Sequence, residues 1–282
     1  MSPESSTGSN RGSAGIYEAF RDAIRAEEPV ALATIIDGPD AGAVSDVRPQ
    51  AGAKLLVRPD APTLGTLGDA GLDRVVERDA LGMLDAGISE VRHYGQHGEA
   101  RQMDVSVFVE CHARRPHMVI FGAVDFTRAL ASQAKLLGYR VTVCDAREVF
   151  ATKRRFPMAD EVVVDWPNRL LDRIGDELGP RDAVCVLTHD HKFDVPAIVG
   201  ALPTRVGYLG AMGSRTTHEK RTERLREAGV TDEGLERVMA PIGLDIGGRT
   251  PEETAVSIVA EIIASHTGRQ APRLKDGEGR IH

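Results

Sequence analysis

The densest group of side chains that could bind a ligand or transfer a proton lies at residues 188–194. This segment, Thr-His-Asp-His-Lys-Phe-Asp, follows an apolar run that is typical of a strand. Imidazoles and carboxylates are acid–base groups and metal ligands, and Lys192 favours a phosphate-bearing ligand over a bare metal ion. The alternative is a purely structural helix start capped by Asp190 or Asp194. As ligand-binding candidates we take His189, His191, Lys192 and Asp194.

Residues 210–215 (Gly-Ala-Met-Gly-Ser-Arg) have the composition of an anion site. Closely spaced glycines, a hydroxyl and a guanidinium ahead of a helix suit a phosphate group. A tight turn that only glycine permits explains the same residues equally well. The ligand-binding candidates here are Gly213, Ser214 and Arg215.

Residues 122–127 (Gly-Ala-Val-Asp-Phe-Thr) stand where a dinucleotide-binding fingerprint would lie. The fingerprint GxGxxG lets the backbone approach a pyrophosphate at a helix N-terminus. Here Val124 and Thr127 replace its second and third glycines. A valine side chain takes up space that the phosphate needs, and Asp125 repels it, so we expect no NAD(P) in the usual pose. Gly122 remains a candidate for contact with another ligand.

Asp145 follows Gly122 by 23 residues, which is close to the spacing of the acid that binds a ribose in dinucleotide-binding folds. The same carboxylate could instead pair with Arg147 at the surface. Both interpretations stay open from the sequence, and Asp145 is included among the candidate cofactor-binding residues.

From residue 117 onward, strand-like and helix-like segments alternate. Such alternation predicts an α/β fold: a Rossmann-like parallel sheet with helices on both faces, whose ligands bind beyond the carboxyl ends of the strands. We expect capping boxes at Thr216/Glu219 and Thr250/Glu253, each at the start of a helix. The predicted strands are 117–122, 140–145, 161–165, 182–188 and 205–210.

Residues 15–112 predict a smaller α+β N-terminal domain, joined through the linker 113–116 to the Rossmann-like domain at 117–268. Its expected elements are a helix at 16–27, a strand at 30–36, a hairpin within 54–67, a helix capped by Asp69, and strands at 88–94 and 103–111. The Ser/Gly-rich segment 1–14 and the polar tail 269–282 predict disorder or mobility.

Composition narrows the classes of function. The 282 residues carry 35 Lys and Arg against 42 Asp and Glu, a net charge of −7, whereas a general nucleic-acid binder needs a basic face. The cysteines Cys111, Cys144 and Cys185 form no CxxC motif, which indicates reduced thiols in an intracellular protein. No apolar run reaches membrane-spanning length. We expect a cytoplasmic protein with neither a nucleic-acid partner nor a membrane partner.

Several motifs together resemble the XdhC/CoxI family, the xanthine dehydrogenase accessory factors. In the second half these motifs are VIFGA, GYRVTVCDAR, T-H-x-H-K-x-D, GxxGSR followed by ERLREAG, and PIGLDIG followed by TPEE, and they cover 117–266. In the first half, residues 48–54 resemble the family's RPPGAK stretch and residues 65–68 its GSLG stretch.

The resemblance implies an accessory factor that binds the molybdenum–pterin cofactor and delivers it to a molybdenum hydroxylase of the xanthine or carbon monoxide dehydrogenase type. It further implies a cysteine desulfurase as a partner of some members. As the assembly of this chain we expect a homodimer. A cofactor-binding chaperone is favoured over a catalyst. Two alternatives stay open: an NAD(P)-dependent oxidoreductase, and a non-catalytic interaction protein whose nucleotide crevice is vestigial.

The chain also departs from the pattern of the family it resembles. It has Gly-Ala-Val-Asp at 122–125 where the family often has GAGH, and Gly71 stands where the family's GGGCVE run has cysteine. Asp190 replaces the glycine of an H-G-H loop, and Thr216-Thr217 stands where a lysine often follows GSR, which weakens any phosphate site. These departures predict a variant ligand or a larger role in partner binding.

Overall fold

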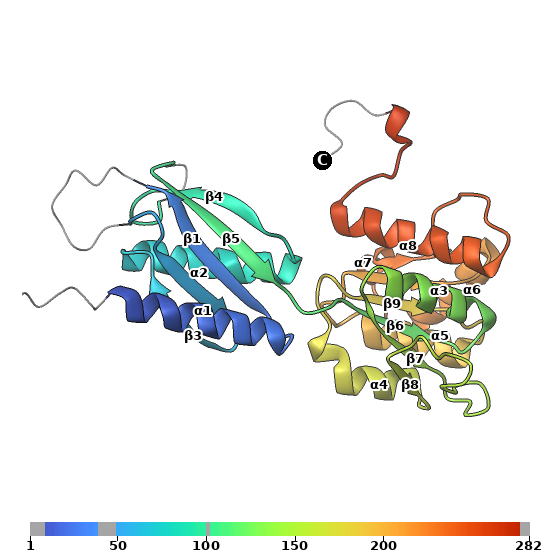
Figure 1. Cartoon of the computed structure of the whole chain (residues 1–282). Helices are drawn as coiled ribbons and strands as arrows, with labels where there is room; N and C mark the ends of the chain where they lie inside the picture. Colours follow the sequence, from blue (N-terminus) through green and yellow to red (C-terminus); the bar gives the residue numbers. More distant parts are fainter. Residues whose placement is uncertain (1–8, 39–48, 100–101, 277–282) are drawn as a thin grey trace, which may run out of the picture. The chain divides into compact units, whose positions relative to one another are not determined.

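A computed structural model describes residues 9–38, 49–99 and 102–276, with side chains from residue 15 onward. The chain divides into two compact units, and the boundary between Arg114 and Arg115 falls inside the predicted linker 113–116. Figure 1 shows the helices and strands of each unit. Within the described ranges, no helix is long and apolar enough to cross a membrane.

The N-terminal unit is built on a five-stranded antiparallel sheet in the order β3-β2-β1-β5-β4. Alternate residues of the central strand β1, among them Ala31, Ala33 and Ile35, are buried in one apolar cluster, as expected for a strand with period-two patterning. The strands are β1 (Val30–Asp37), β2 (Lys54–Arg58), β3 (Ala61–Thr66), β4 (Glu90–Tyr94) and β5 (Val105–His112).

Two helices pack on this sheet. Helix α2 (Ala70–Ala86) buries its apolar side against β1, β2 and β5, and α1 (Ser9–Arg25) packs through Ile16, Phe20 and Ala23 on Val30 and Leu56. The predicted cap of α2 is confirmed, because Asp69 accepts hydrogen bonds from the amides of Gly71 (2.8 Å) and Leu72 (3.0 Å).

Helix α1 corrects the expectation of disorder over residues 1–14, because it begins at Ser9. Once packing on the sheet has nucleated a helix, each further residue adds a hydrogen bond at little cost, so the helix extends into a Ser/Gly-rich stretch. Residues 1–8 lie outside the described residues. In the tail predicted at 269–282, a short 3₁₀ turn, η2, covers Leu274–Asp276.

The C-terminal unit contains a six-stranded parallel sheet in the order β11-β10-β9-β6-β7-β8. Counted along the unit's own strands, this is the Rossmann order, which reverses between β6 and β9. The prediction of a Rossmann-like parallel sheet is therefore confirmed. The strands are β6 (His117–Phe121), β7 (Arg140–Cys144), β8 (Glu161–Val163), β9 (Ala183–Val186), β10 (Tyr208–Ala211) and β11 (Val238–Met239).

Helices cover both faces of this sheet, as predicted (Figure 1). Helices α3 (Asp125–Leu136) and α8 (Pro251–Thr267) share one apolar cluster with one set of strand residues. Helices α4 (Pro167–Ile174), α5 (His191–Ala201) and α6 (Arg215–Glu227) share the other cluster with the alternate set. The shorter elements η1 (Gly175–Glu177) and α7 (Asp232–Glu236) complete the unit.

One of the two predicted capping boxes is confirmed and one is wrong. Thr250 and Glu253 form a reciprocal box at the start of α8. Helix α6 starts earlier than expected: its cap is Ser214, whose hydroxyl accepts from the amide of Thr217 at 3.2 Å. The pattern at Thr216 matched the motif by spacing alone.

Candidate functional site

Two candidate loops touch where the strand order reverses, between β6 and β9. Gly122 has φ +110°, and a Cβ atom there would lie 2.6 Å from Thr188 Cγ2 and 3.1 Å from the Thr188 amide nitrogen. No side chain fits at position 122 without displacing the neighbouring loop. Gly122 thus allows the β6–α3 and β9–α5 loops to meet at the edge where Rossmann folds bind ligands.

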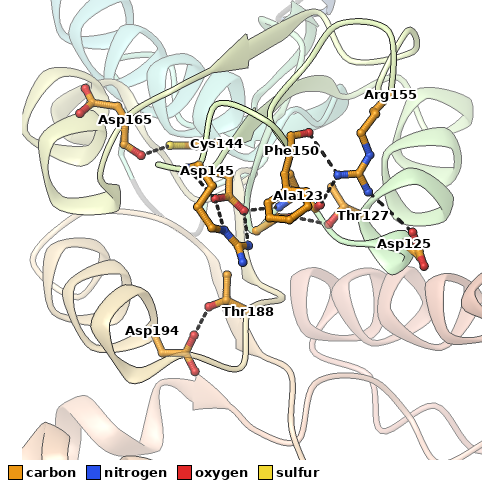
Figure 2. A network of polar contacts seen from close by, with 12 residues as sticks. Ala123, Asp125, Thr127, Cys144, Asp145, Phe150, Arg155, Asp165, Thr188 and Asp194 are labelled. Atoms are coloured by element: carbon orange, nitrogen blue, oxygen red, sulfur yellow. Dashed lines mark hydrogen bonds and ion pairs between the residues drawn. The ribbon is translucent and has the colours of Figure 1, made fainter.

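A buried ion pair joins the third loop to these two. Asp194 Oδ2 accepts hydrogen bonds from Arg221 Nη2 (2.9 Å) and Nε (3.2 Å), and Asp194 also accepts one from the Thr188 hydroxyl (Figure 2). Arg221 Nη2 donates to the Met212 carbonyl at 2.6 Å. Both charged residues are only 3% exposed. This ion pair between α5 and α6 therefore links the β9–α5 loop, through Thr188, to the β10–α6 loop, through Met212.

The sequence did not single out Arg221, which is one of several cations on a highly charged helix. Its partner Asp194 was predicted as a ligand-binding residue, and the structure gives that carboxylate a structural partner. A ligand contact by Asp194 stays a prediction.

The other candidates of segment 188–194, which covers the β9–α5 loop and the first turn of α5, face solvent. His189, His191 and Lys192 are exposed, and Asp190 caps α5 by accepting from the Lys192 amide at 3.0 Å. The capped helix start that competed with the ligand-site interpretation is therefore present, with Asp190 as its cap. Because that carboxylate already lies at the N-terminus of α5, a phosphate is better placed beside another helix.

Asp145 pairs with Arg147, which is one of its two predicted roles (Figure 2 shows the carboxylate). Its oxygens accept from the Ala123 amide (2.8 Å), the Arg147 amide (3.0 Å), Arg147 Nε (2.9 Å) and Arg147 Nη2 (2.7 Å). Burial alone raises the pKa of this carboxyl, but the Arg147 guanidinium and the amides outweigh burial and lower the pKa below its ordinary value. A carboxylate has about four acceptor sites, and these four hydrogen bonds occupy them. Asp145 therefore holds the β6–α3 loop and Arg147 in place. Ribose binding by Asp145 stays a prediction.

The side chains of Val124, in the β6–α3 loop, and Asp125, at the start of α3, have neighbours other than Asp145. Val124 packs against the apolar cluster under α3, and the 92% exposed side chain of Asp125 lies 3.7 Å from Arg155 Nη2. Figure 2 marks the contact between Asp125 and Arg155. Arg155 also donates to the Ala123 carbonyl at 3.0 Å. The steric and charge arguments against a phosphate at this turn are therefore weaker than the sequence indicated, and the exclusion of NAD(P) stays a prediction.

The β10–α6 loop lies at the same carboxyl edge of the sheet, and the cation Arg215 follows it as the first residue of α6. Gly213 has φ +150°, and a Cβ atom there would lie 3.1 Å from Thr217. The Ser214 hydroxyl bonds Thr217 at the helix start, whereas Arg215 is exposed. The first turn of α6 carries no acidic residue, so its N-terminus and Arg215 are electrostatically suited to an anion.

In the N-terminal unit, the stretch that departs from the family pattern is tightly packed. A Cβ atom on Gly71 would lie 2.6 Å from the His97 carbonyl oxygen and 3.0 Å from Asp69 Oδ1. His97 Nδ1 also contacts Asp69 Oδ2 at 2.8 Å. The turn bearing His97 therefore lies where a side chain at position 71 would project.

Restoring a cysteine through Gly71→Cys is expected to lower the free energy of unfolding by about 1–3 kcal/mol, because the new side chain overlaps a backbone carbonyl. Gly71→Ala should cost a similar amount, and both are measurable by urea denaturation. Gly82→Ala in the same helix is the control: nothing lies within 4 Å of its Cβ position, so it should be neutral or stabilising. Equal stability of Gly71→Cys and wild type would contradict the packing argument.

The Asp69–His97 pair predicts a pH-dependent contribution to stability. The hydrogen bond to Asp69 raises the pKa of His97, and the hydrogen bonds from His97 and the Leu72 amide lower the pKa of Asp69. The histidine contribution is complete below its ordinary pKa of about 6.5 and is lost as pH rises through the folded pKa. The aspartate contribution is complete above about 4 and is lost as pH falls through its own folded pKa.

The wild type should therefore exceed His97→Gln in stability more at pH 5.5 than at pH 8.5. Thermal unfolding of both proteins at the two pH values measures this, since other titrating groups affect both alike. An equal difference at both pH values would show that protonation of His97 adds nothing to the stability.

Taken together, the strand order, the glycine turn at position 122 and the loops at the carboxyl edge define a Rossmann domain of the dinucleotide-binding topology. Comparison with known families is more specific. The family described as the XdhC Rossmann domain matches residues 118–262, and the XdhC and CoxI family matches residues 23–95. The chain belongs to the XdhC/CoxI family, as its motifs predicted.

Its curated relatives are longer proteins. It is 29% identical over 255 residues to the uncharacterized protein YqeB of Escherichia coli, covering 86% of this chain and 45% of that protein. It is 33% identical over 158 residues to a probable xanthine dehydrogenase subunit of Bacillus subtilis (56% and 45% coverage). It is 35% identical over 145 residues to the molybdenum cofactor insertion chaperone PaoD of Escherichia coli (51% and 38% coverage). The chain thus spans less than half of the length of each.

A crystal structure described as a xanthine dehydrogenase from Bacillus halodurans has the same fold. The TM-score is 0.50 at 20% sequence identity, and the match covers 91% of this chain and 97% of that one. At this identity the likeness supports the fold alone.

Proposed function

We propose that this chain binds the molybdenum–pterin cofactor at the carboxyl edge of its Rossmann sheet and delivers it to a molybdenum hydroxylase. Membership of the XdhC/CoxI family supports this role, as does the similarity to a cofactor insertion chaperone and to a probable xanthine dehydrogenase component. The chain acts as an accessory factor, and the hydroxylase carries out the oxidation.

The observation that carries the proposal is the contact among the three predicted loops. Gly122 abuts Thr188, Thr188 bonds Asp194, and Asp194 pairs with Arg221 beneath Met212. Candidates from segments up to about 90 residues apart in sequence are thereby held along one edge of the sheet. A ligand with a ring system and a phosphate needs such an extended, preorganised edge.

The donor set fits the phosphate end of the cofactor. Lys192 and Arg215 are exposed cations, and the first turn of α6 carries no acidic residue. Helix N-termini and cations of this kind bind phosphate. When bound, the cofactor supplies the metal centre for the hydroxylase, and the residues of this chain bind and orient it.

Acid oxidation of the purified protein, followed by detection of fluorescent pterin, tests cofactor binding directly. The protein should be produced in cells that make the cofactor, and wild type should carry pterin. The double variant Lys192→Ala/Arg215→Ala should retain at least about tenfold less, because the two charge-assisted contacts together contribute more than about 2 kcal/mol.

Arg269→Ala/Lys275→Ala is the matched control with the same change in charge. Both residues are exposed and follow α8, whose C-terminus is about 25 Å along its axis from its start. The start of α8, in contrast, lines a surface pocket of 360 Å³ together with Val124 and Asp125, near the carboxyl edge of the sheet. The control residues, beyond the other end of α8, are therefore outside the proposed ligand site. Wild type free of pterin, or equal loss in both double variants, would refute cofactor binding at this edge.

Delivery is tested by a client assay. A molybdenum hydroxylase produced together with wild type should gain activity over the hydroxylase produced alone, and the Lys192→Ala/Arg215→Ala variant should restore less. We also propose a cytoplasmic location, a homodimer and, for sulfuration, a cysteine desulfurase as a partner. Light scattering of the purified chain and co-purification with a desulfurase test the last two.

A further inference from the structure

Four side chains at the carboxyl edge of the sheet form an aromatic shelf: Arg147, Phe150, Trp166 and Phe193. The rings of Trp166 and Phe193 are stacked, with centroids 4.8 Å apart and planes 14° apart. The Arg147 guanidinium lies over Phe150 at 4.7 Å and over Phe193 at 5.6 Å. These residues follow β7, β8 and β9, so three separate segments of the chain, including the first turn of α5, build one surface.

This cluster lies outside the hydrophobic core. Among the described residues, the two core clusters of the C-terminal unit contain none of the three rings. Phe150 is 41% exposed and Trp166 is 39% exposed. Aromatic residues make up only 4% of the chain, and Trp166 is its single tryptophan. Large apolar rings gathered at the surface indicate a binding function rather than a packing requirement.

The guanidinium in the shelf is held in place. Asp145 is buried and accepts two hydrogen bonds from the Arg147 side chain, at 2.9 Å and 2.7 Å. This pairing fixes the plane of the cation, whose side chain is still 45% exposed. A fixed guanidinium beside exposed rings presents flat surfaces on which another flat ring can stack.

We propose that the aromatic shelf binds the planar heteroaromatic ring of the ligand, with the phosphate toward the neighbouring glycine loops. The inference rests on the proposed function for the identity of that ligand. The required chemistry is a flat, nitrogen-rich ring that carries a phosphate. A pterin and the base of a nucleotide both have this chemistry, and the experiment separates them.

The single tryptophan makes the test direct. Fluorescence of Trp166, excited at a wavelength selective for tryptophan, is followed in the purified protein during titration with neopterin, CMP, GMP or inorganic phosphate. N-acetyltryptophanamide corrects for absorption by the probes. We expect saturable quenching by at least one ring-bearing probe and none by inorganic phosphate. Quenching by neopterin assigns the shelf to the pterin, and quenching by CMP or GMP assigns it to the base of a nucleotide.

Variants of the shelf complete the test. Phe193→Leu and Phe150→Leu keep Trp166 as the reporter and should weaken binding about tenfold, which is in the range for loss of one stacked ring. The control Tyr17→Leu removes a 64% exposed aromatic ring from α1 and should leave binding unchanged.

The proposal is overturned if neopterin, CMP and GMP all leave the fluorescence unchanged, or if both phenylalanine variants bind as tightly as wild type. Either result leaves the proposed function intact, provided that wild type carries pterin and the Lys192→Ala/Arg215→Ala variant has lost it. Conversely, if wild type carries no pterin but its fluorescence is quenched by CMP or GMP, binding of the molybdenum–pterin cofactor is refuted and ring binding by the aromatic shelf is supported.

Discussion

An Asp194→Ala variant is expected to unfold with a free energy about 3–5 kcal/mol lower than that of wild type, measured by urea denaturation. Removing this carboxylate leaves the Arg221 guanidinium buried without a counter-charge, and breaking a buried pair from one side costs about this much. The Thr188 hydroxyl loses its acceptor as well. Because Asp194 and Arg221 are each only 3% exposed, water cannot compensate without opening the loops.

Two controls separate burial from charge. The exposed pair Arg226–Asp232, whose side chains are 58% and 82% exposed, should lose less than about 1 kcal/mol in Asp232→Ala. The double variant Asp194→Ala/Arg221→Leu removes both charges, so it should be more stable than Asp194→Ala alone. An Asp194→Ala variant as stable as Asp232→Ala would show that the pair does not support the ligand edge.

The same variants decide what Asp194 does for a ligand. Loss of pterin in Asp194→Ala alone has two explanations, a lost contact or a disordered edge. If the double variant Asp194→Ala/Arg221→Leu folds and carries pterin as wild type does, Asp194 positions the loops and makes no required contact. Loss of pterin in that folded variant supports the ligand-binding interpretation of the sequence.

The fold of the C-terminal unit was predictable because both faces of its central strands are covered. Strands such as β6 (His117–Phe121) and β9 (Ala183–Val186) are buried at every residue, so they stand out as continuous apolar runs between helical patterns. Strand β11 has only Val238 and Met239. Two residues are too few to show a periodic pattern, so the pairing of β11 with β10 depends on tertiary contacts.

The candidate site was predictable only to the level of its loops. Strand ends and glycines located the loops, since parallel topology places carboxyl ends along one edge. Which carboxylate is buried was not predictable: Asp190 became the exposed helix cap and Asp194, four residues later, the buried partner of Arg221. That ion pair spans 27 residues, and local pattern contains no information about contacts at this distance.

The aromatic shelf was missed for a similar reason. Phe150, Trp166 and Phe193 are spaced irregularly and come from different segments of the chain, so no local motif joins them. The one available signal was compositional, because the chain's single tryptophan lies just after a predicted strand at the ligand edge. The fold brings Trp166 beside Phe193, and the tryptophan thereby becomes part of a surface.

Gly122→Ala is expected to lower the free energy of unfolding by about 2–6 kcal/mol and to abolish pterin retention. The methyl group meets Thr188 Cγ2 at 2.6 Å, and φ +110° is a backbone conformation that alanine rarely adopts. Backbone strain of about 1–3 kcal/mol adds to an overpacking penalty of similar size. Relief of the overlap requires separating the β6–α3 and β9–α5 loops, which changes the edge that the ligand contacts.

Gly138→Ala measures the backbone penalty by itself. Gly138, at the end of α3, has φ +81° but no atom within 4 Å of its Cβ position, so alanine there should cost only about 1–2 kcal/mol and leave pterin retention unchanged. Urea denaturation and acid-oxidised pterin are measured for both variants. Equal stability losses with equal pterin content would show that the contact between Gly122 and Thr188 is not required, and the ligand edge would then have to be built without it.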